Sequence, residues 1–382
     1  MRTSPIYDRI NRTLSARKAN SQFRSIPQYT EHEKSIDLSS NSYLSLHACN
    51  EIRREAAMLI ENHHWGNLAS RLVEEHSPLF CELEKEICNW KETETALLFN
   101  SGYAANLGII SAVCSKDTEV FCDRLNHASI YDGIILSGCK LNRYSHNDMS
   151  DLNKRLEQSV SKEKMIITDT VFSMDGDRAP LCDICELAKK HNAMVMVDEA
   201  HAAGIFGKQG NGMADEQGVA EFIDIKMGTL SKAVAGLGGF FAGSSLLKDY
   251  FVNHCRSLIY STALPHSVLA FNLASIHYIR NNPKIGKKLL ILSQRFRNSL
   301  KKIGCNTLNS TTQIIPFVTG NENEAIALSG FLRQYGIIAP AIRPPTVPRQ
   351  SARLRFSVHL GFDEQQQDFV IDKLLQWKKQ NG

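Results

Sequence analysis

The stretches AMVMVDEAH (residues 193–201) and IKMGTLSKA (225–233) decide the fold. Each begins with an apolar run of strand length and ends in polar residues. Similar apolar runs recur about 25 to 35 residues apart, with helical patterns between them. They are TALLF (95–99), EVFCD (119–123) and KMIITD (164–169). Buried strands at this spacing predict βαβ units and a mainly parallel sheet flanked by helices.

A chain of 382 residues is too long for one ordinary core, so we expect it to divide into parts. We predict an N-terminal arm (1–50) that carries a helix, a large α/β domain (51–285) and a smaller C-terminal α+β domain (286–382). The large domain contains helical patterns at 51–62, 79–90 and 103–113. The small one contains strands at IIPFVTG (314–320) and ARLRFSV (352–358) and a helix over 323–335.

The composition is that of an ordinary soluble globular protein, with 43% hydrophobic and 22% charged residues. A net charge of +4 is too small to indicate binding to nucleic acid or to an anionic membrane. The first residues contain no apolar signal region, and no apolar run is long enough to span a bilayer. We therefore expect a cytoplasmic enzyme that acts on small molecules.

The ten cysteines are scattered and indicate a reduced compartment. The one close pair, Cys182 and Cys185, has no second pair at metal-binding spacing. We interpret it as two thiols on one helix face rather than a metal or redox site, and we predict no metal site.

Two residues at predicted strand ends have two interpretations each. Asp198 is either a helix N-cap or a charge placed for a ligand. Lys232 is either a solvated surface lysine or a Schiff-base lysine. Together with the hydroxyls of Thr229 and Ser231 and the glycines that follow, the two match the needs of pyridoxal 5′-phosphate. An aspartate keeps the pyridine nitrogen protonated, a lysine carries the cofactor as an imine, and hydroxyls suit phosphate oxygens.

Two further segments follow predicted strands. NSGYAAN (100–106) opens a helix whose N–H groups suit a phosphate, although a plain helix cap explains it equally well. His127 follows the strand at 119–123. Its imidazole either stacks on a pyridine ring or is a hydrogen-bonded structural histidine.

These residues belong to stretches that resemble the motifs of a known family. From the N-terminal helix to about Phe356, the chain resembles the α-oxoamine synthases, which are fold-type-I (aspartate aminotransferase-like) pyridoxal-phosphate enzymes. The specific stretches are SSNSYL (39–44), NSGYAAN, DRLNHASIYDG (123–133), VFSMDGDRAPL (171–181), VDEAHAAGIFGKQGNG (197–212), GTLSKA (228–233) and LIYSTALP (258–265). The resemblance implies condensation of an amino acid with an acyl thioester and loss of carbon dioxide. The tail AIRPPTVPRQSARLR (341–355) resembles the branch that joins L-alanine to a pimeloyl thioester of coenzyme A or acyl carrier protein in biotin synthesis.

Carried over by position, the resemblance implies a role for each motif residue. The catalytic residues would be Lys232 for the imine, Asp198 for the ring nitrogen and His127 for the ring face. The other cofactor-binding residues would be Ser101, Gly102, Tyr103, Ser173, His201 and Thr229, with Ser261 and Thr262 reaching the phosphate from the second subunit of a homodimer. The substrate-binding residues would be Asn41, Thr346, Arg353 for the amino-acid carboxylate, and Arg24 for the far carboxylate of the acyl chain.

The sequence departs from the family pattern at positions near the expected substrate site. Glu74 and Glu75 replace small residues, and Phe80 stands where many members have histidine. Asp169 stands where glutamate is common, and Ala-Ala follows His201 in place of the frequent Gly-Thr. These changes leave the cofactor residues intact, but they leave the acyl chain and its carrier open.

Three other functions are compatible with parts of the pattern. A sister condensing enzyme would join glycine to acetyl-CoA or an amino acid to a longer acyl-CoA. A fold-type-I aminotransferase would share Lys232 and Asp198 but would not use a thioester. A non-catalytic partner subunit would lack the lysine, which is present here.

Overall fold

The computed structural model describes residues 4–26, 35–61, 63–73 and 77–381. The chain forms two compact units. The larger comprises Asn41–Ile291 with His359–Gly361, and the smaller comprises Met1–Ser40, Leu292–Val358 and Phe362–Gly382. The N-terminal arm predicted over 1–50 is therefore shared between them. The residues up to Ser40 join the C-terminal segments, because the strand near residue 36 pairs with one near residue 337.

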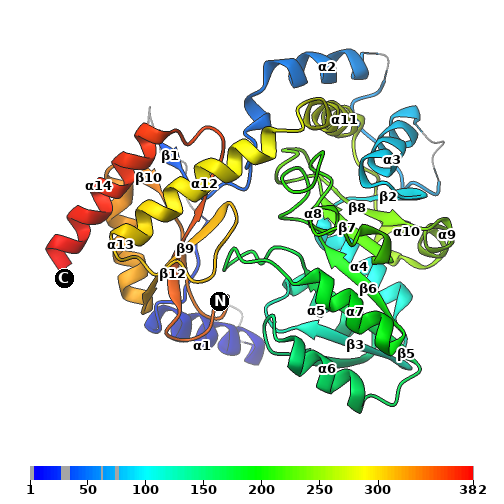
Figure 1. Ribbon diagram of the computed structural model, residues 1–382, viewed down its shortest axis with the longest axis horizontal. Coiled ribbons are helices and arrows are strands. Elements are labelled where there is room, and N and C mark those ends of the chain that lie inside the picture. Colours follow the sequence, from blue (N-terminus) through cyan, green and yellow to red (C-terminus); the bar gives the residue numbers. More distant parts are fainter. Residues whose placement is uncertain (1–3, 27–34, 62, 74–76, 382) are drawn as a thin grey trace. The chain divides into compact units, whose positions relative to one another are not determined.

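The larger unit is built on a seven-stranded sheet in the order β2-β8-β7-β6-β5-β3-β4 (Figure 1). The strands are β2 (Thr95–Phe99), β3 (Thr118–Asp123), β4 (Lys140–Tyr144), β5 (Glu163–Asp169), β6 (Ala193–Asp198), β7 (Ile225–Thr229) and β8 (Gly239–Gly243). All neighbours are parallel except β8, which is antiparallel to both β2 and β7. The segment between β7 and β8 is too short for a crossover helix, so β8 must return antiparallel. The predicted fold class is confirmed.

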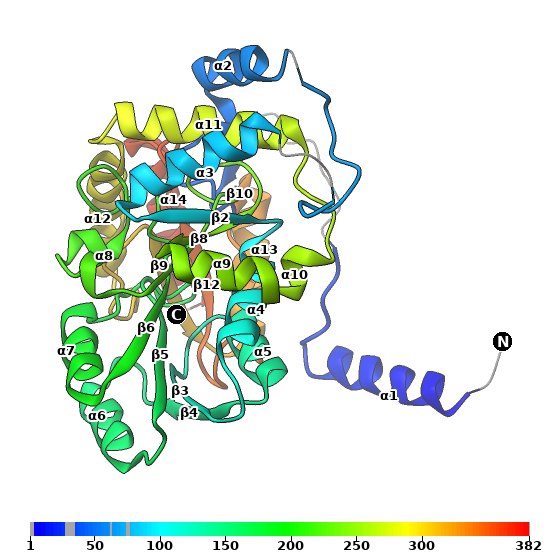
Figure 2. The same cartoon turned by 90° about the vertical axis from the view of Figure 1, so that its right-hand side faces the viewer.

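Helices cover both faces of this sheet. Figure 2 shows α6 (Met149–Gln158) and α7 (Leu181–His191) on one side of β5 and β6, and α4 (Gly102–Val113) and α5 (Ala128–Ser137) on the other. The remaining helices of this unit are η1 (Leu46–Ala48), α2 (Asn50–Ile60), α3 (Pro78–Lys91), α8 (Met213–Glu216), η2 (Ala220–Phe222), α9 (Ser245–His254), α10 (Arg256–Ile259) and α11 (His266–Asn281). Helix α12 (Ile285–Lys302) begins in the larger unit and continues in the smaller one.

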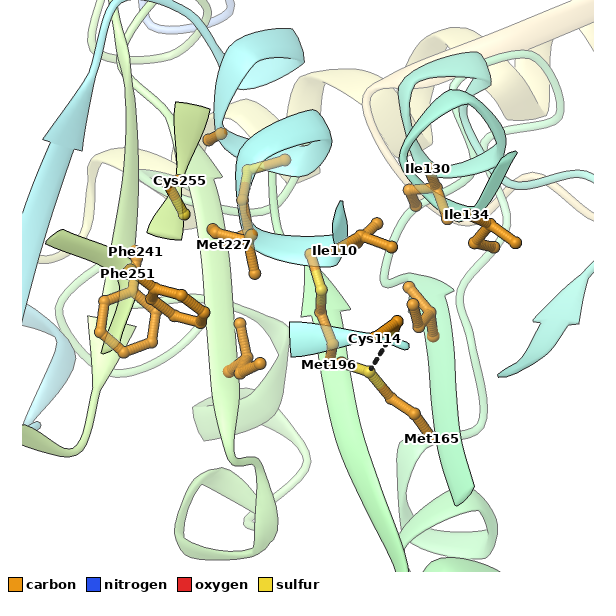
Figure 3. Packing of buried hydrophobic residues seen from close by; sticks show 14 of the residues in the cluster. Ile110, Cys114, Ile130, Ile134, Met165, Met196, Met227, Phe241, Phe251 and Cys255 are labelled. Carbon is orange, nitrogen blue, oxygen red and sulfur yellow. Dashed lines mark hydrogen bonds between the residues drawn. The ribbon is translucent and has the colours of Figure 1, made fainter. Parts of the chain in front are cut away.

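The core between α4 and the sheet is a cluster of buried apolar side chains (Figure 3). Ile109 and Ile110 of α4 are completely buried in the cluster that also contains Met196 and Met227 of the strands. The Sγ atom of Cys114, at the end of α4, lies 3.6 Å from Sδ of Met165. Burying such side chains contributes about 1.5–3 kcal/mol each. This packing fixes α4, whose first turn lies beside the carboxyl ends of the strands.

The smaller unit contains a three-stranded antiparallel sheet in the order β11-β12-β9 and a separate parallel pair, β1-β10. The strands are β1 (Ile36–Asp37), β9 (Ile314–Gly320), β10 (Ile337–Ile338), β11 (Ala341–Ile342) and β12 (Ala352–Ser357). The helices are α1 (Pro5–Ala19), α13 (Glu322–Gln334) and α14 (Glu364–Asn381). Strand β9 has the predicted bounds of 314–320, and α13 and β12 lie within one residue of theirs.

Within the described part of the chain, no helix is long and apolar enough to cross a bilayer. Cys182 and Cys185 both lie on α7 as free thiols, the first exposed and the second buried. Their three-residue spacing on one helix agrees with the sequence interpretation of two thiols on one helix face.

Candidate active site

A cavity of about 160 Å³ lies in the larger unit, where β5, β6 and β7 end and α4 begins. This is the edge of a parallel sheet at which α/β proteins bind ligands. Nine of the predicted site residues line it. They are Ser101, Gly102, Tyr103, His127, Ser173, Asp198, His201, Thr229 and Lys232. The cavity therefore gathers residues from five segments that are far apart in the sequence.

Asp198, at the end of β6, is buried and held by two N–H donors. Its Oδ2 accepts a hydrogen bond from Nδ2 of Asn106 at 2.8 Å, and its Oδ1 accepts one from the backbone N–H of Ala200 at 2.8 Å. The residues after Asp198 form turns and not a helix, so it is not a helix N-cap. Both donors stabilise the ionised carboxylate and aim it into the cavity.

Asn106 is the important site residue that sequence reasoning did not single out. It is completely buried in α4 and donates to Oγ of Ser129 at 2.9 Å as well as to Asp198. A lone asparagine within the apolar run ANLGII was the available signal, because a buried amide needs polar partners. It links α4 and α5 to the carboxylate on β6.

Another part of the cavity lining is a cradle of hydroxyl and N–H groups at the start of α4. Ser101 caps the helix, since its Oγ accepts the N–H of Ala104 at 3.0 Å. A Cβ atom on Gly102 would lie 3.3 Å from Cβ of Thr229, so glycine permits the close approach. Oγ1 of Thr229 donates to the carbonyl of Gly238 at 2.8 Å and lies 2.8 Å from Oγ of Ser231. The other N–H groups of the first turn suit an anion.

His127 forms one wall of the cavity and also caps α5. Its Nδ1 lies 2.7 Å from Oγ of Ser129, and its ring meets that of Tyr103 edge-on at 6.2 Å between centroids. Burial lowers the pKa of His127, and the nearby charge of Lys232 adds to this, while Asp198 opposes it. The imidazole is therefore neutral at pH 7 and fixed in orientation. His127 is thus a hydrogen-bonded cap that also lines the cavity, and its stacking on a pyridine ring stays a prediction.

His201 is fixed by a chain of hydrogen bonds. Nδ1 of His201 lies 2.7 Å from the hydroxyl of Tyr43, which donates to Oδ1 of Asn41 at 2.9 Å. These contacts hold the imidazole of His201 in the cavity wall. Asn41, predicted to bind substrate, thus acts on the cavity wall through Tyr43.

Lys232 is partly buried and follows β7 in a tight turn. The turn needs left-handed backbone at Ala235 (φ 61°) and Gly238 (φ 121°) before the chain enters β8. Lys232 and Asp198 therefore lie on neighbouring strand ends of one cavity, as the sequence predicted.

Ser261 and Thr262 lie outside the lining of this cavity. Nδ2 of Asn100 donates to Oγ of Ser261 at 2.7 Å and to the carbonyl of Thr262. Both residues are thus held beside the segment that leads into α4 of their own chain.

Three predicted substrate residues belong to the smaller unit. Nη2 of Arg24 donates to Oγ1 of Thr346 at 2.8 Å, so two of the predicted substrate-binding residues contact each other. Arg353 on β12 is only 3% exposed, and its Nε donates to the carbonyl of Ser351 at 2.9 Å.

The residues that depart from the family pattern have separate surroundings. Phe80 is buried in α3 beneath the guanidinium of Arg71, 4.4 Å from the ring centroid. Asp169 lines the cavity. Glu74 and Glu75 lie outside the described residues.

Comparison with known proteins agrees with this geometry. The family model for aminotransferase class I and II matches residues 33–374. The chain belongs to this family. It is 44% identical to a Geobacillus kaustophilus protein named as an 8-amino-7-oxononanoate synthase, over 88% of this chain and 87% of that one. A Halalkalibacterium halodurans protein of the same name is 40% identical over 90% and 87% of the two chains.

Solved structures of the same family have the same fold. A Sphingomonas wittichii serine palmitoyltransferase is 30% identical, with a TM-score of 0.86 over 90% of this chain and 86% of that one. An 8-amino-7-oxononanoate synthase from Francisella tularensis is 27% identical, with a TM-score of 0.79 over 91% and 99% of the chains. The chain is therefore a pyridoxal 5′-phosphate enzyme, an acyltransferase of the α-oxoamine synthase type.

The residues that line the cavity fit this cofactor. The buried carboxylate of Asp198 suits a protonated ring nitrogen, and the cradle at the start of α4 suits a phosphate. Lys232 supplies the amine, and the neutral ring of His127 supplies a flat wall. The fit rests on the donor and acceptor set of the larger unit alone.

Proposed function

We propose that the enzyme condenses L-alanine with a pimeloyl thioester and releases 8-amino-7-oxononanoate, carbon dioxide and the free thiol. The observation that carries the proposal is the match to relatives named as 8-amino-7-oxononanoate synthases. They align with about nine-tenths of the chain at 40–44% identity. The cavity around Lys232, Asp198 and His127 provides the groups that this chemistry needs.

Four residues would hold the cofactor in place. Asp198 would keep the ring nitrogen protonated, with Asn106 supporting its charge. Ser101 and Gly102 would bind the phosphate at the start of α4, and Thr229 would complete this cradle. The bound cofactor supplies an electron sink for a carbanion at the α-carbon of the amino acid.

Lys232 would carry the cofactor at rest and then act as a base. After alanine has displaced it, its amine would remove the proton from the α-carbon, and it would return a proton there after carbon dioxide has left. His127 would cover one face of the ring and restrict the reaction to the other. Because its imidazole is neutral, it adds no positive charge that would oppose the protonated ring nitrogen.

Substrate selection would depend on residues of the smaller unit and of a second subunit. A guanidinium binds a carboxylate with two parallel hydrogen bonds, so we assign the alanine carboxylate to Arg353. Arg24 and Thr346, which contact each other, would bind the far carboxylate of the pimeloyl chain. Asn41 would support the substrate site through Tyr43 and His201. Ser261 and Thr262 would reach the phosphate of the partner in a homodimer.

A second candidate is another condensation of the same type, such as that of serine with a long-chain acyl thioester. It is favoured by the TM-score of 0.86 with serine palmitoyltransferase at 30% identity. The tail at 341–355 favours the pimeloyl substrate instead.

A substrate panel tests the proposal. Alanine, glycine and serine are each paired with pimeloyl, acetyl and palmitoyl thioesters of coenzyme A and acyl carrier protein. We measure kcat/KM from thiol release and identify the product by mass, with Lys232→Ala as the background control. The proposal predicts the highest kcat/KM for alanine with a pimeloyl thioester. A higher value for any other pair contradicts it and identifies the alternative enzyme.

A further inference from the structure

The cavity contains a second buried carboxyl group beside Asp198. Asp169 ends β5 as Asp198 ends β6, and the two are register partners on adjacent parallel strands. Each is 4% exposed, and both line the cavity. Two carboxyl groups are therefore buried side by side at the place where the cofactor ring must lie.

The two carboxyl groups receive different support. Asp198 accepts hydrogen bonds from Asn106 and from the N–H of Ala200, one on each oxygen. Asp169 accepts a hydrogen bond at Oδ2 from the backbone N–H of His127, at 3.0 Å. Since N–H donors stabilise the charged form, Asp198 is the better site for the negative charge.

The charged and titratable groups around Asp169 reinforce this difference. Burial raises the pKa of Asp169 well above its ordinary value, and the adjacent charge of Asp198 raises it further. Asp123, at the end of β3, acts in the same direction, whereas Lys232 and the N–H of His127 oppose it. The imidazole of His127 is neutral and contributes no balancing charge. One lysine therefore faces two carboxyl groups, and two like charges buried on adjacent strand ends do not both ionise readily.

We propose that Asp169 is a neutral carboxylic acid in the working enzyme, and that its O–H donates a hydrogen bond to an anionic oxygen of the group bound in the cavity. Asp198 alone carries the negative charge for the ring nitrogen. Asp169 therefore acts as a hydrogen-bond donor where a second carboxylate would repel the bound anion. This role is independent of which amino acid and thioester react, so it goes beyond the proposed function.

Binding of pyridoxal 5′-phosphate to the apoenzyme tests the donor role. Asp169→Asn keeps a neutral group with a donor, whereas Asp169→Leu is neutral without one. Loss of a hydrogen bond to a charged acceptor weakens binding about tenfold or more. We expect Asp169→Leu to raise the dissociation constant at least about tenfold and Asp169→Asn to raise it less than about threefold. Equal weakening by both variants overturns the proposal.

A direct measurement on the unaltered sequence covers the case in which a variant fails to fold. The side-chain carboxyl carbons of aspartate are labelled with 13C, in the apoenzyme and the holoenzyme, and NMR spectra are followed with pH. The signal of Asp169 is assigned by its absence from the spectrum of an Asp169 variant that folds. If neither variant folds, the spectrum of the unaltered protein is searched for a carboxyl signal that is neutral at pH 7. We expect one buried carboxyl to remain protonated at pH 7. A spectrum in which every aspartate is ionised at pH 7 refutes the proposal.

Discussion

Replacing Lys91 by methionine tests how the strand end that carries Asp198 is held. Nζ of Lys91 donates to Oε2 of Glu199 at 2.7 Å and to the carbonyl of Asn211 at 2.5 Å. The side chains are 0% and 1% exposed, so this ion pair is fully buried. Methionine keeps the length of the side chain but leaves the charge of Glu199 without its partner.

The expected loss is large because an uncompensated charge stays buried. Removing one partner of a buried pair costs about 3–5 kcal/mol. The amine of Lys226 also lies near this pair and is attracted by Glu199. It partly compensates the charge of Glu199, so we expect a loss of stability nearer to about 3 than to about 5 kcal/mol. At roughly 2 °C per kcal/mol for a unit of this size, the Tm should fall by about 6–10 °C.

The assay is thermal unfolding of the apoenzyme, followed by circular dichroism. Lys190→Met is the matched control, since Lys190 pairs with Glu157 at the surface and both side chains are more than half exposed. It should leave the Tm unchanged within error. The double variant Lys91→Met/Glu199→Gln should recover part of the loss, because no charge remains unpaired. A Tm for Lys91→Met no lower than that of Lys190→Met would refute the reasoning.

Three further predictions concern the cavity and its surroundings. Asn106→Ala should weaken binding of pyridoxal 5′-phosphate about tenfold, because Asp198 loses a hydrogen-bond donor worth about 1.5 kcal/mol. Fluorescence titration of the apoenzyme with the cofactor checks this, and an unchanged affinity contradicts it. Burial lowers the pKa of His146, but its hydrogen bonds to Asp123 and Asp177 outweigh this and raise the pKa from 6.5 to about 9. The stability that His146 contributes should therefore be complete below pH 6.5 and lost as the pH rises through about 9; His146→Gln should abolish that part of the pH dependence of the Tm. Lys232→Ala should abolish both turnover and the visible absorbance of the lysine-bound cofactor, and turnover at the wild-type rate would exclude the assigned role.

The sequence predicted the fold where apolar runs are bounded by polar or turn residues. TALLF and IKMGT became β2 and β7 with the predicted bounds. Strand β4 was not predicted because KLNRY is mostly polar and forms the edge of the sheet. Strand β8 was not predicted either. Its residues GFFAG are short and follow several glycines, which hides a strand pattern, although this strand joins β2 to β7.

The site was predictable where a residue belongs to a motif at a strand end, as Asp198 and Lys232 do. The residues that hold them were not. Asn106 lies inside a helix and Tyr43 lies some 160 positions before His201, so only the folded chain brings these polar partners together. Asp169 was noted in the sequence as a departure from the family pattern, and its pairing with Asp198 follows from the register of β5 and β6.

The most direct test of the central proposal follows the carboxyl carbon of alanine. L-Alanine labelled there with 13C is incubated with pimeloyl-CoA and the holoenzyme, and labelled carbon dioxide, free thiol and aminoketone are measured together. Decarboxylative condensation predicts equal amounts of all three, with no label in the aminoketone. Label found in pyruvate, or labelled product formed without release of thiol, would contradict it.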